Sequence, residues 1–180
     1  MFKSIVFLLL LPCCFLFTLD FLAYQHRLEE LNVKIESISL TLNDSSVWET
    51  SKENLEEIKK FQVSDPVIIT ANNSWFQSEY PLRVINQRTY SSINIKNLFC
   101  PLIDNPFARF LSNLDLERNT LILNDSLAFS LSSKDWALYQ SWQEGDFILI
   151  GINSEWLTTY TCPVILINLS TNSYVRATPF

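Results

Sequence analysis

The sequence contains few of the residues on which most enzymes build an active site. His26 is the single histidine in 180 residues, and Gly145 and Gly151 are the only glycines. A Ser–His or Cys–His nucleophile pair cannot form in the rest of the chain, and a histidine-rich metal site is excluded as well. A glycine-rich phosphate loop is also absent. The sequence therefore predicts a protein that is not an enzyme and that binds no metal ion and no cofactor.

Basic residues are also scarce, which bears on the partners. The chain has 13 Lys and Arg residues against 19 Asp and Glu residues, so its net charge is −6. Nucleic-acid binding depends on clustered basic side chains that contact phosphates. We therefore expect no nucleic-acid partner.

The second half of the chain repeats the first. Residues 40–75 and 121–156 align with a constant offset of 81, and after one inserted residue the match continues with an offset of 82. Such a repeat indicates two equivalent units, which we place at residues 38–97 and 119–180. Units of about sixty residues bury little surface alone, so we expect the two to pack together. Identical pairs include Leu40/Leu121, Leu42/Leu123, Asn43/Asn124, Asp44/Asp125, Asp65/Asp146, Asn72/Asn153, Trp75/Trp156, Pro81/Pro163 and Asn86/Asn168.

Short apolar segments alternate with turn residues in each repeat, which is typical of β-strands. Five strands and one short helix per repeat predict a mainly β protein. Specifically, we expect tandem duplicated small β-barrels, SH3-like or OB-like, behind an N-terminal membrane helix. Because glycine is scarce, Asn, Asp or Ser must supply the positive φ angles of the turns. In the first repeat the strands are predicted at 38–42, 47–48, 65–71, 82–85 and 92–95, and the helix at 51–61.

The N-terminal segment is the longest apolar run. Lys3 precedes an apolar stretch that reaches Leu19, which is the pattern of an export signal. Residues 1–24 are therefore predicted to direct export. We favour an uncleaved signal anchor that contacts membrane lipid through residues 2–23. Cleavage to a secreted protein and lipidation at Cys13 are the alternatives.

Two helices are predicted outside the repeats. In residues 25–37, Leu28, Leu31 and Ile35 fall at the spacing of a helical seam, so this segment is predicted to be a helical stalk. The stalk either packs on the first repeat or joins a second copy of the chain. Residues 98–118, between the repeats, are predicted to form a linker helix.

Two pairs of aspartates occupy matching places in both repeats, Asp44 with Asp125 and Asp65 with Asp146. Paired carboxylates can act as an acid and a base. Each aspartate, however, stands at a strand boundary in a predicted turn, where its side chain accepts hydrogen bonds from nearby backbone. We favour the turn role over the catalytic one.

Cys100 and Cys162 are the only cysteines outside the N-terminal segment. In an oxidising compartment these two residues can form a disulfide. The distance between them decides whether they do, and the sequence leaves both outcomes open.

The candidate binding residues are two tryptophans in matching polar segments. Trp75 follows Asn72 by three residues, and Trp156 follows Asn153 in the same way. An exposed tryptophan can stack on a sugar or anchor a protein partner. A tryptophan that closes the end of a barrel from inside is the alternative, and the repeat is compatible with both.

Several motifs of the second repeat occur together, namely Leu121 to Ser126, Trp142 to Asp146, Ile148 to Ile150 and Pro163 to Asn168. In this combination the chain resembles an uncharacterised family of exported envelope proteins from Gram-negative bacteria. The first repeat departs from the pattern. The resemblance implies an envelope location and no particular activity, cofactor or catalytic residue.

These features predict a non-enzymatic, membrane-anchored envelope protein whose exported part is a protein interaction or assembly module. Its partner is expected to be another protein, or a second copy of the chain joined through the stalk. The alternative is a module that binds glycan or a cell-wall ligand through Trp75 and Trp156.

Overall fold

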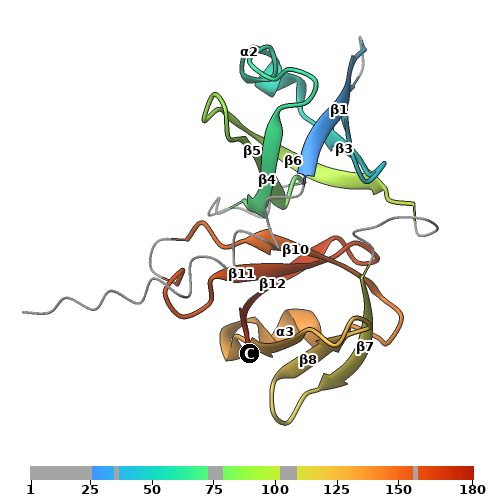
Figure 1. Cartoon of the computed structure of the whole chain (residues 1–180), viewed down its shortest axis with the longest axis vertical. Helices are drawn as coiled ribbons and strands as arrows, with labels where there is room; N and C mark the ends of the chain where they lie inside the picture. Colours follow the sequence, from blue (N-terminus) through green and yellow to red (C-terminus); the bar gives the residue numbers. More distant parts are fainter. Residues whose placement is uncertain (1–25, 35–36, 73–78, 102–108, 156–157) are drawn as a thin grey trace, which may run out of the picture.

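The computed structural model describes residues 26–34, 37–72, 79–101, 109–155 and 158–180, which form a mainly β structure of twelve strands (Figure 1). No helix in this part of the chain is long and apolar enough to cross a membrane. The predicted signal anchor, residues 1–24, lies outside the described residues.

The first six strands close into a small barrel, which occupies the upper part of Figure 1. Its strands follow the order β1-β2-β3-β6-β5-β4, and β4 pairs again with β1, where Val67 lies opposite His26. The prediction of a mainly β fold with a small barrel is confirmed, with six strands in the barrel rather than five. The elements are β1 (His26–Val33), β2 (Ile38–Leu42), β3 (Val47–Thr50), η1 (Lys52–Asn54), α2 (Leu55–Ile58), β4 (Pro66–Ala71), β5 (Leu82–Asn86) and β6 (Ser92–Phe99).

The remaining six strands follow the same pairing order, β7-β8-β9-β12-β11-β10. β10 also pairs with β7, where Ile148 lies opposite Arg109. A short helix again lies between the third and fourth strands of this half. The elements are β7 (Arg109–Asp115), β8 (Thr120–Leu123), β9 (Ala128–Leu131), η2 (Ser133–Asp135), α3 (Trp136–Tyr139), β10 (Phe147–Ile152), β11 (Val164–Asn168) and β12 (Ser173–Pro179).

Alternating apolar and polar residues explain why the predicted strands form. In β2, Ile38, Leu40 and Leu42 are buried, whereas Ser39 and Thr41 are only partly buried. This period of two is expected for a strand that has one face on the core. All ten strands predicted within the repeats are present, each within a few residues of its predicted place.

The predicted helical stalk at residues 25–37 is wrong, because its described part contains strand β1. A β-bulge between Leu28 and Glu30 adds one residue to the strand. Leu28 and Leu31 can therefore both contact the core although they are three residues apart. The spacing that indicated a helix is thus the spacing of a bulged strand, while Ile35 lies outside the described residues.

The predicted linker helix at residues 98–118 is also wrong in its described part. β6 extends to Phe99, and residues 109–115 form β7. β7 carries the same kind of bulge as β1, between Leu111 and Asn113. Residues 102–108 lie outside the described part of the chain.

The two halves pack against each other along β4 and β10. These strands run parallel, with Thr70 opposite Ile152, and Ile165 of the second half belongs to the core of the first. Gly151 permits this approach, because a Cβ atom at this position would lie 2.6 Å from the carbonyl oxygen of Ile69. The expectation that the halves pack together is confirmed.

Positive φ angles occur at six described residues other than glycine. Serine and asparagine supply five of them, as expected, while Tyr90 supplies the sixth and aspartate supplies none among the described residues. Ser64, with φ of 73°, occupies the turn position that Gly145, with φ of 89°, holds in the second half. The six residues are Ser45, Ser64, Tyr90, Asn119, Ser126 and Asn172.

Candidate functional site

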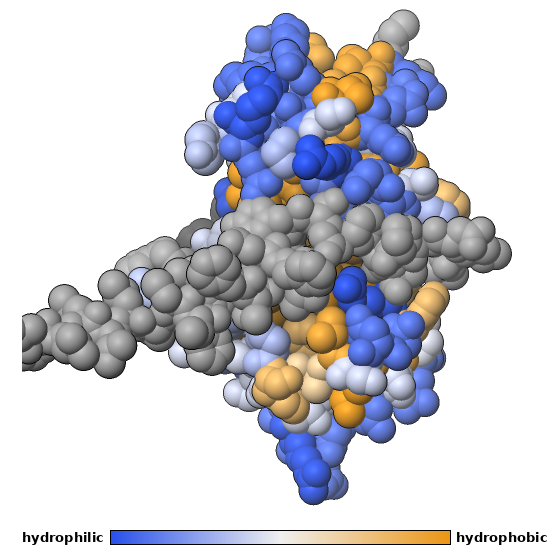
Figure 2. All heavy atoms as spheres, viewed as in Figure 1, coloured by the Kyte–Doolittle hydropathy of each residue, from blue (hydrophilic) through white to orange (hydrophobic). Residues whose placement is uncertain are grey.

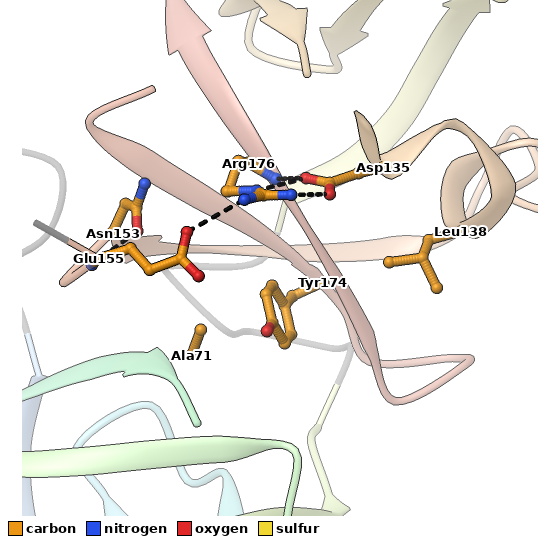
Figure 3. A pocket seen from close by; sticks show the side chains of 7 residues that line it. All are labelled: Ala71, Asp135, Leu138, Asn153, Glu155, Tyr174 and Arg176. Carbon is orange, nitrogen blue, oxygen red and sulfur yellow. Dashed lines mark hydrogen bonds and ion pairs between the residues drawn. The ribbon is translucent and has the colours of Figure 1, made fainter. Parts of the chain in front are cut away.

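A polar cavity of about 100 Å³ opens where the two halves meet (Figure 3). One wall comes from the first half, where β4 ends at Ala71. The other residues belong to the second half and come from η2, α3, the segment after β10, and β12. The cavity, which we call the junction pocket, is lined by Ala71, Asp135, Leu138, Asn153, Glu155, Tyr174 and Arg176.

Arg176 is the centre of the charged wall of the junction pocket. Its guanidinium donates Nε–H to Asp135 Oδ2 at 2.9 Å and a second hydrogen bond from Nη2 to Asp135 Oδ1. On the other side Nη1 donates to Glu155 Oε2 at 3.0 Å (Figure 3). The hydrogen bonds to the buried Asp135 raise the pKa of Arg176 above its usual value. The wall therefore carries two carboxylates and one permanent cation.

Tyr174 and Glu155 line the same wall of the junction pocket. Tyr174 adds an uncharged phenol, and Glu155 adds a carboxylate that is partly exposed. The Tyr174 side chain is partly buried, and this burial, together with the negative charge of Glu155, raises its pKa. The phenol therefore stays protonated at neutral pH. Glu155 Oε2 also accepts a hydrogen bond from the Thr158 hydroxyl at 2.8 Å, which helps to hold the carboxylate in the pocket wall.

Two predicted binding residues, Asn72 and Asn153, hold equivalent turns. Asn153 is buried, and its Nδ2 donates to the carbonyl oxygen of Cys162 at 2.7 Å. Asn72 Nδ2 donates in the same way to the carbonyl oxygen of Tyr80 at 2.8 Å. Both asparagines therefore position the loop between two strands. Trp75 and Trp156, the predicted binding tryptophans, lie outside the described residues.

The repeated aspartates serve turns, as the sequence indicated. Asp44 Oδ1 accepts a hydrogen bond from the backbone N–H of Ser46 at 3.0 Å, and Asp125 Oδ1 accepts one from Leu127 at 3.2 Å. The second pair behaves alike, because the Gln62 and Gln143 backbone N–H groups donate to Asp65 and Asp146. Each carboxylate thus stabilises its own turn.

Asp65 and Asp146 each accept a hydrogen bond from an equivalent asparagine, since Asn86 Nδ2 donates to Asp65 Oδ2 at 2.5 Å and Asn168 Nδ2 donates to Asp146 Oδ2 at 2.6 Å. Only Asp65 also pairs with an arginine, because Arg88 Nε donates to its Oδ1 at 2.5 Å. The hydrogen bond from Arg88 is the main reason that the pKa of Asp65 falls to about 2. The position that corresponds to Arg88 in the second repeat is Ser170, so this ion pair belongs to the first half.

The single histidine lies buried at the start of β1. Its Nδ1 is 3.9 Å from Asp44 Oδ2. The equivalent contact in the second half joins Arg109 Nε to Asp125 Oδ2 at 2.9 Å. Burial lowers the pKa of His26, Asp44 opposes this, and Arg109 adds to it. A titratable residue thus stands where the other half has a permanent cation.

The candidate disulfide is not formed in the structure. Cys100 and Cys162 are both thiols, each partly buried. Cys100 directly follows β6, and its Sγ lies 3.9 Å from the Pro101 carbonyl oxygen. Cys162 is held in a turn by a backbone hydrogen bond to Thr158 at 2.7 Å. The described chain also contains no group of three metal-ligating side chains.

Arg176 and Asp135, the most strongly paired residues of the junction pocket, were not predicted from the sequence. The repeat contained a signal, however. The first-half residues at the corresponding positions are Asn94 and Asn54, which are uncharged. One copy of the repeat thus carries a pair of opposite charges where the other copy is neutral. Such a difference marks these two positions as candidates for a role that only the second half has.

Comparisons with known proteins leave the family of this chain open. No family model, no curated protein and no solved structure matches it.

Proposed function

We propose that this chain is a non-enzymatic, membrane-anchored envelope protein and that its exported part is a protein interaction or assembly module. The anchor rests on the apolar N-terminal segment, and the envelope location rests on the resemblance described above. The interaction role rests on exposed apolar side chains of the second half, one of which lines the junction pocket.

Those side chains come from α3 and from the segment after β10. Trp136 and Leu138 are 47% and 45% exposed, and Tyr160 is 96% exposed. Leu138 also lines the junction pocket. Aromatic residues are enriched at protein interfaces and carry much of their binding energy. Figure 2 shows apolar residues reaching a mostly hydrophilic surface in both halves. The exposure of Trp136, which directly follows the pocket residue Asp135, is the observation that carries the proposal.

In-cell photo-crosslinking tests this proposal. A photoreactive aromatic amino acid replaces Trp136 or Tyr160 in the full chain, and Tyr90 serves as the control. Tyr90 is 85% exposed but belongs to the first half. We expect a discrete protein product from Trp136 and Tyr160 that Tyr90 does not give. Equal labelling from all three sites, or no protein product from Trp136, would argue against an interface around the pocket. Trp75 and Trp156 are further sites for the same experiment.

We also infer that the second half is a copy of the first barrel, so that the chain contains two duplicated small barrels of the SH3-like or OB-like kind. The support is the shared strand order and the matching turn contacts. The Ser64 and Gly145 backbone N–H groups, for example, donate to the equivalent residues Leu28 and Leu111. Hydrogen exchange measured on the folded full chain should then show two sets of protected amides at equivalent positions of the two halves.

Glycan or cell-wall binding through Trp75 and Trp156 is the second candidate. The junction pocket favours it in one respect, since Trp156 directly follows Glu155. A cavity of about 100 Å³ is nevertheless smaller than the roughly 300 Å³ or more of most ligand pockets. We therefore place it second. Saturable quenching of tryptophan fluorescence by soluble glycan fragments, lost in Trp156→Ala, would raise it to first.

A further inference from the structure

The junction pocket contains two polar groups that no other group of the described chain binds. Arg176 and Thr158 both donate to Oε2 of Glu155, and within the described chain no hydrogen bond reaches Oε1. The Tyr174 hydroxyl likewise makes no hydrogen bond to a described residue. Glu155 is partly exposed, so a group that enters the pocket from outside can reach its unbound oxygen.

The charge of the pocket favours a cation. Asp135 binds Arg176 through two hydrogen bonds and therefore neutralises it. The Glu155 carboxylate is then left as the net charge of the wall. The whole chain carries −6, so the surrounding field also attracts positive groups. An anion would have to approach both carboxylates, which is unfavourable.

Among cations, the pocket favours an alkylammonium group, because one oxygen of Glu155 lacks a hydrogen-bond donor among the described residues and two of the walls are apolar. A guanidinium binds best when both oxygens of a carboxylate accept from it, and Oε2 of Glu155 is already occupied. An ammonium is a compact charge that one oxygen can accept, and the ring of Tyr174 can add a cation–π contact. About 100 Å³ is the space of about three water molecules. Leu138 and Ala71 provide apolar walls for the methylene groups.

We propose that the junction pocket binds an alkylammonium group, and that this group is the side chain of a lysine on the partner protein. The inference rests on the proposed interaction function and names the chemistry that its partner presents. Glu155 accepts the hydrogen bond, Tyr174 faces the charge, and Asp135 keeps Arg176 from repelling it.

The pocket is tested with n-butylammonium chloride as the probe. Amide shifts of the full chain, kept soluble in a non-ionic detergent, are followed by NMR at constant ionic strength. We expect saturable shifts around Glu155 and Tyr174 with a dissociation constant of about 1–10 mM, and none with n-butanol. Glu155→Gln should weaken binding at least about tenfold. Glu144→Gln changes an exposed carboxylate of the same half and should leave binding unchanged. Equal shifts with butanol, or binding unaffected by Glu155→Gln, would overturn the proposal.

The source of the ammonium is tested by carbodiimide coupling in cells. The reagent joins a carboxylate and an amine in contact, with loss of water, into an amide. We expect a conjugate between Glu155 and a lysine of the protein that Trp136 captures by photo-crosslinking. If a protein is captured from Trp136 but this conjugate does not form, the bound ammonium is not a lysine of that protein. The proposed interaction function would still stand. If no protein is captured but butylammonium still binds, the interaction function fails instead.

Discussion

Replacing Gly151 with alanine should push the two halves apart at their closest approach. The new Cβ atom would lie 2.6 Å from the carbonyl oxygen of Ile69 and 2.9 Å from Cγ1 of Ile165. The first of these contacts involves backbone, which cannot move aside by changing a rotamer. β4 and β10 must therefore separate by several tenths of an ångström along their shared edge.

The cost follows from the general behaviour of overpacked interiors. An inserted methyl group in a tight core destabilises a protein by about 1–3 kcal/mol, and backbone contact places Gly151→Ala in the upper half of that range. For a chain of this size, about 2–3 kcal/mol lowers the melting temperature by roughly 5–10 °C. Ser130→Ala is the matched control, because Ser130 lies exposed on β9 and its loss should change stability by less than about 0.5 kcal/mol.

Urea unfolding followed by tryptophan fluorescence measures the effect. Ile165→Ala removes Cγ1 and Cδ1 of Ile165, so measuring the cost of Gly151→Ala with and without Ile165→Ala separates the two contacts. If the Ile69 carbonyl is the obstacle, Gly151→Ala should cost as much in the Ile165→Ala chain as in the parent chain. A Gly151→Ala variant as stable as the parent chain, or a cost that disappears in the Ile165→Ala chain, would refute the argument that backbone packing at this position holds the halves together.

Three further predictions concern single residues. Ser64→Gly should stabilise the fold by about 0.5–1 kcal/mol in urea unfolding, and Gly145→Ser should destabilise it by a similar amount, because both positions have positive φ. If both variants are as stable as the parent chain, the φ angles cause no strain at these positions. Because the pKa of His26 is lowered below 6.5 in the fold, its contribution to stability should be complete above pH 6.5 and decline as the pH falls below it. Unfolding midpoints between pH 7.5 and 5 should show this slope in the parent chain and lose it in His26→Gln. Asp135→Asn should cost about 2 kcal/mol by leaving Arg176 half paired, and the double variant with Arg176→Asn should recover most of the loss, which a double-mutant cycle measures.

The strands of the repeats could be predicted because their signal is local. Apolar residues alternate within each strand, and the two copies supplied two readings of every element. Strands β1 and β7 were not predicted. In β1 a bulge spaces Leu28 and Leu31 as a helix would, and β7 carries the same kind of bulge. A bulge depends on the partner strand, and that of β1 lies in its pairing with β2, where Leu28 is opposite Leu42 and Glu30 is opposite Thr41.

The candidate site was predicted less well than the fold. Sequence reasoning selected Asn72 and Asn153 because they are repeated, and in the structure both hold loops. The pocket instead uses Asp135 and Arg176, which are 41 positions apart and meet because η2 lies against β12. Only the three-dimensional packing of these elements brings the two charges together.

The comparison of the halves also indicates why those charges are present. In the first half, Thr50 Oγ1 donates to the carbonyl oxygen of Asn94 at 2.6 Å and accepts from Asn54 Nδ2 at 2.8 Å. The same place in the barrel is thus joined by uncharged hydrogen bonds. A buried ion pair contributes little net stability compared with a neutral replacement. An ion pair is therefore not the only way to join these two elements, and the charges of Asp135 and Arg176 are consistent with the ammonium site that we propose for the junction pocket.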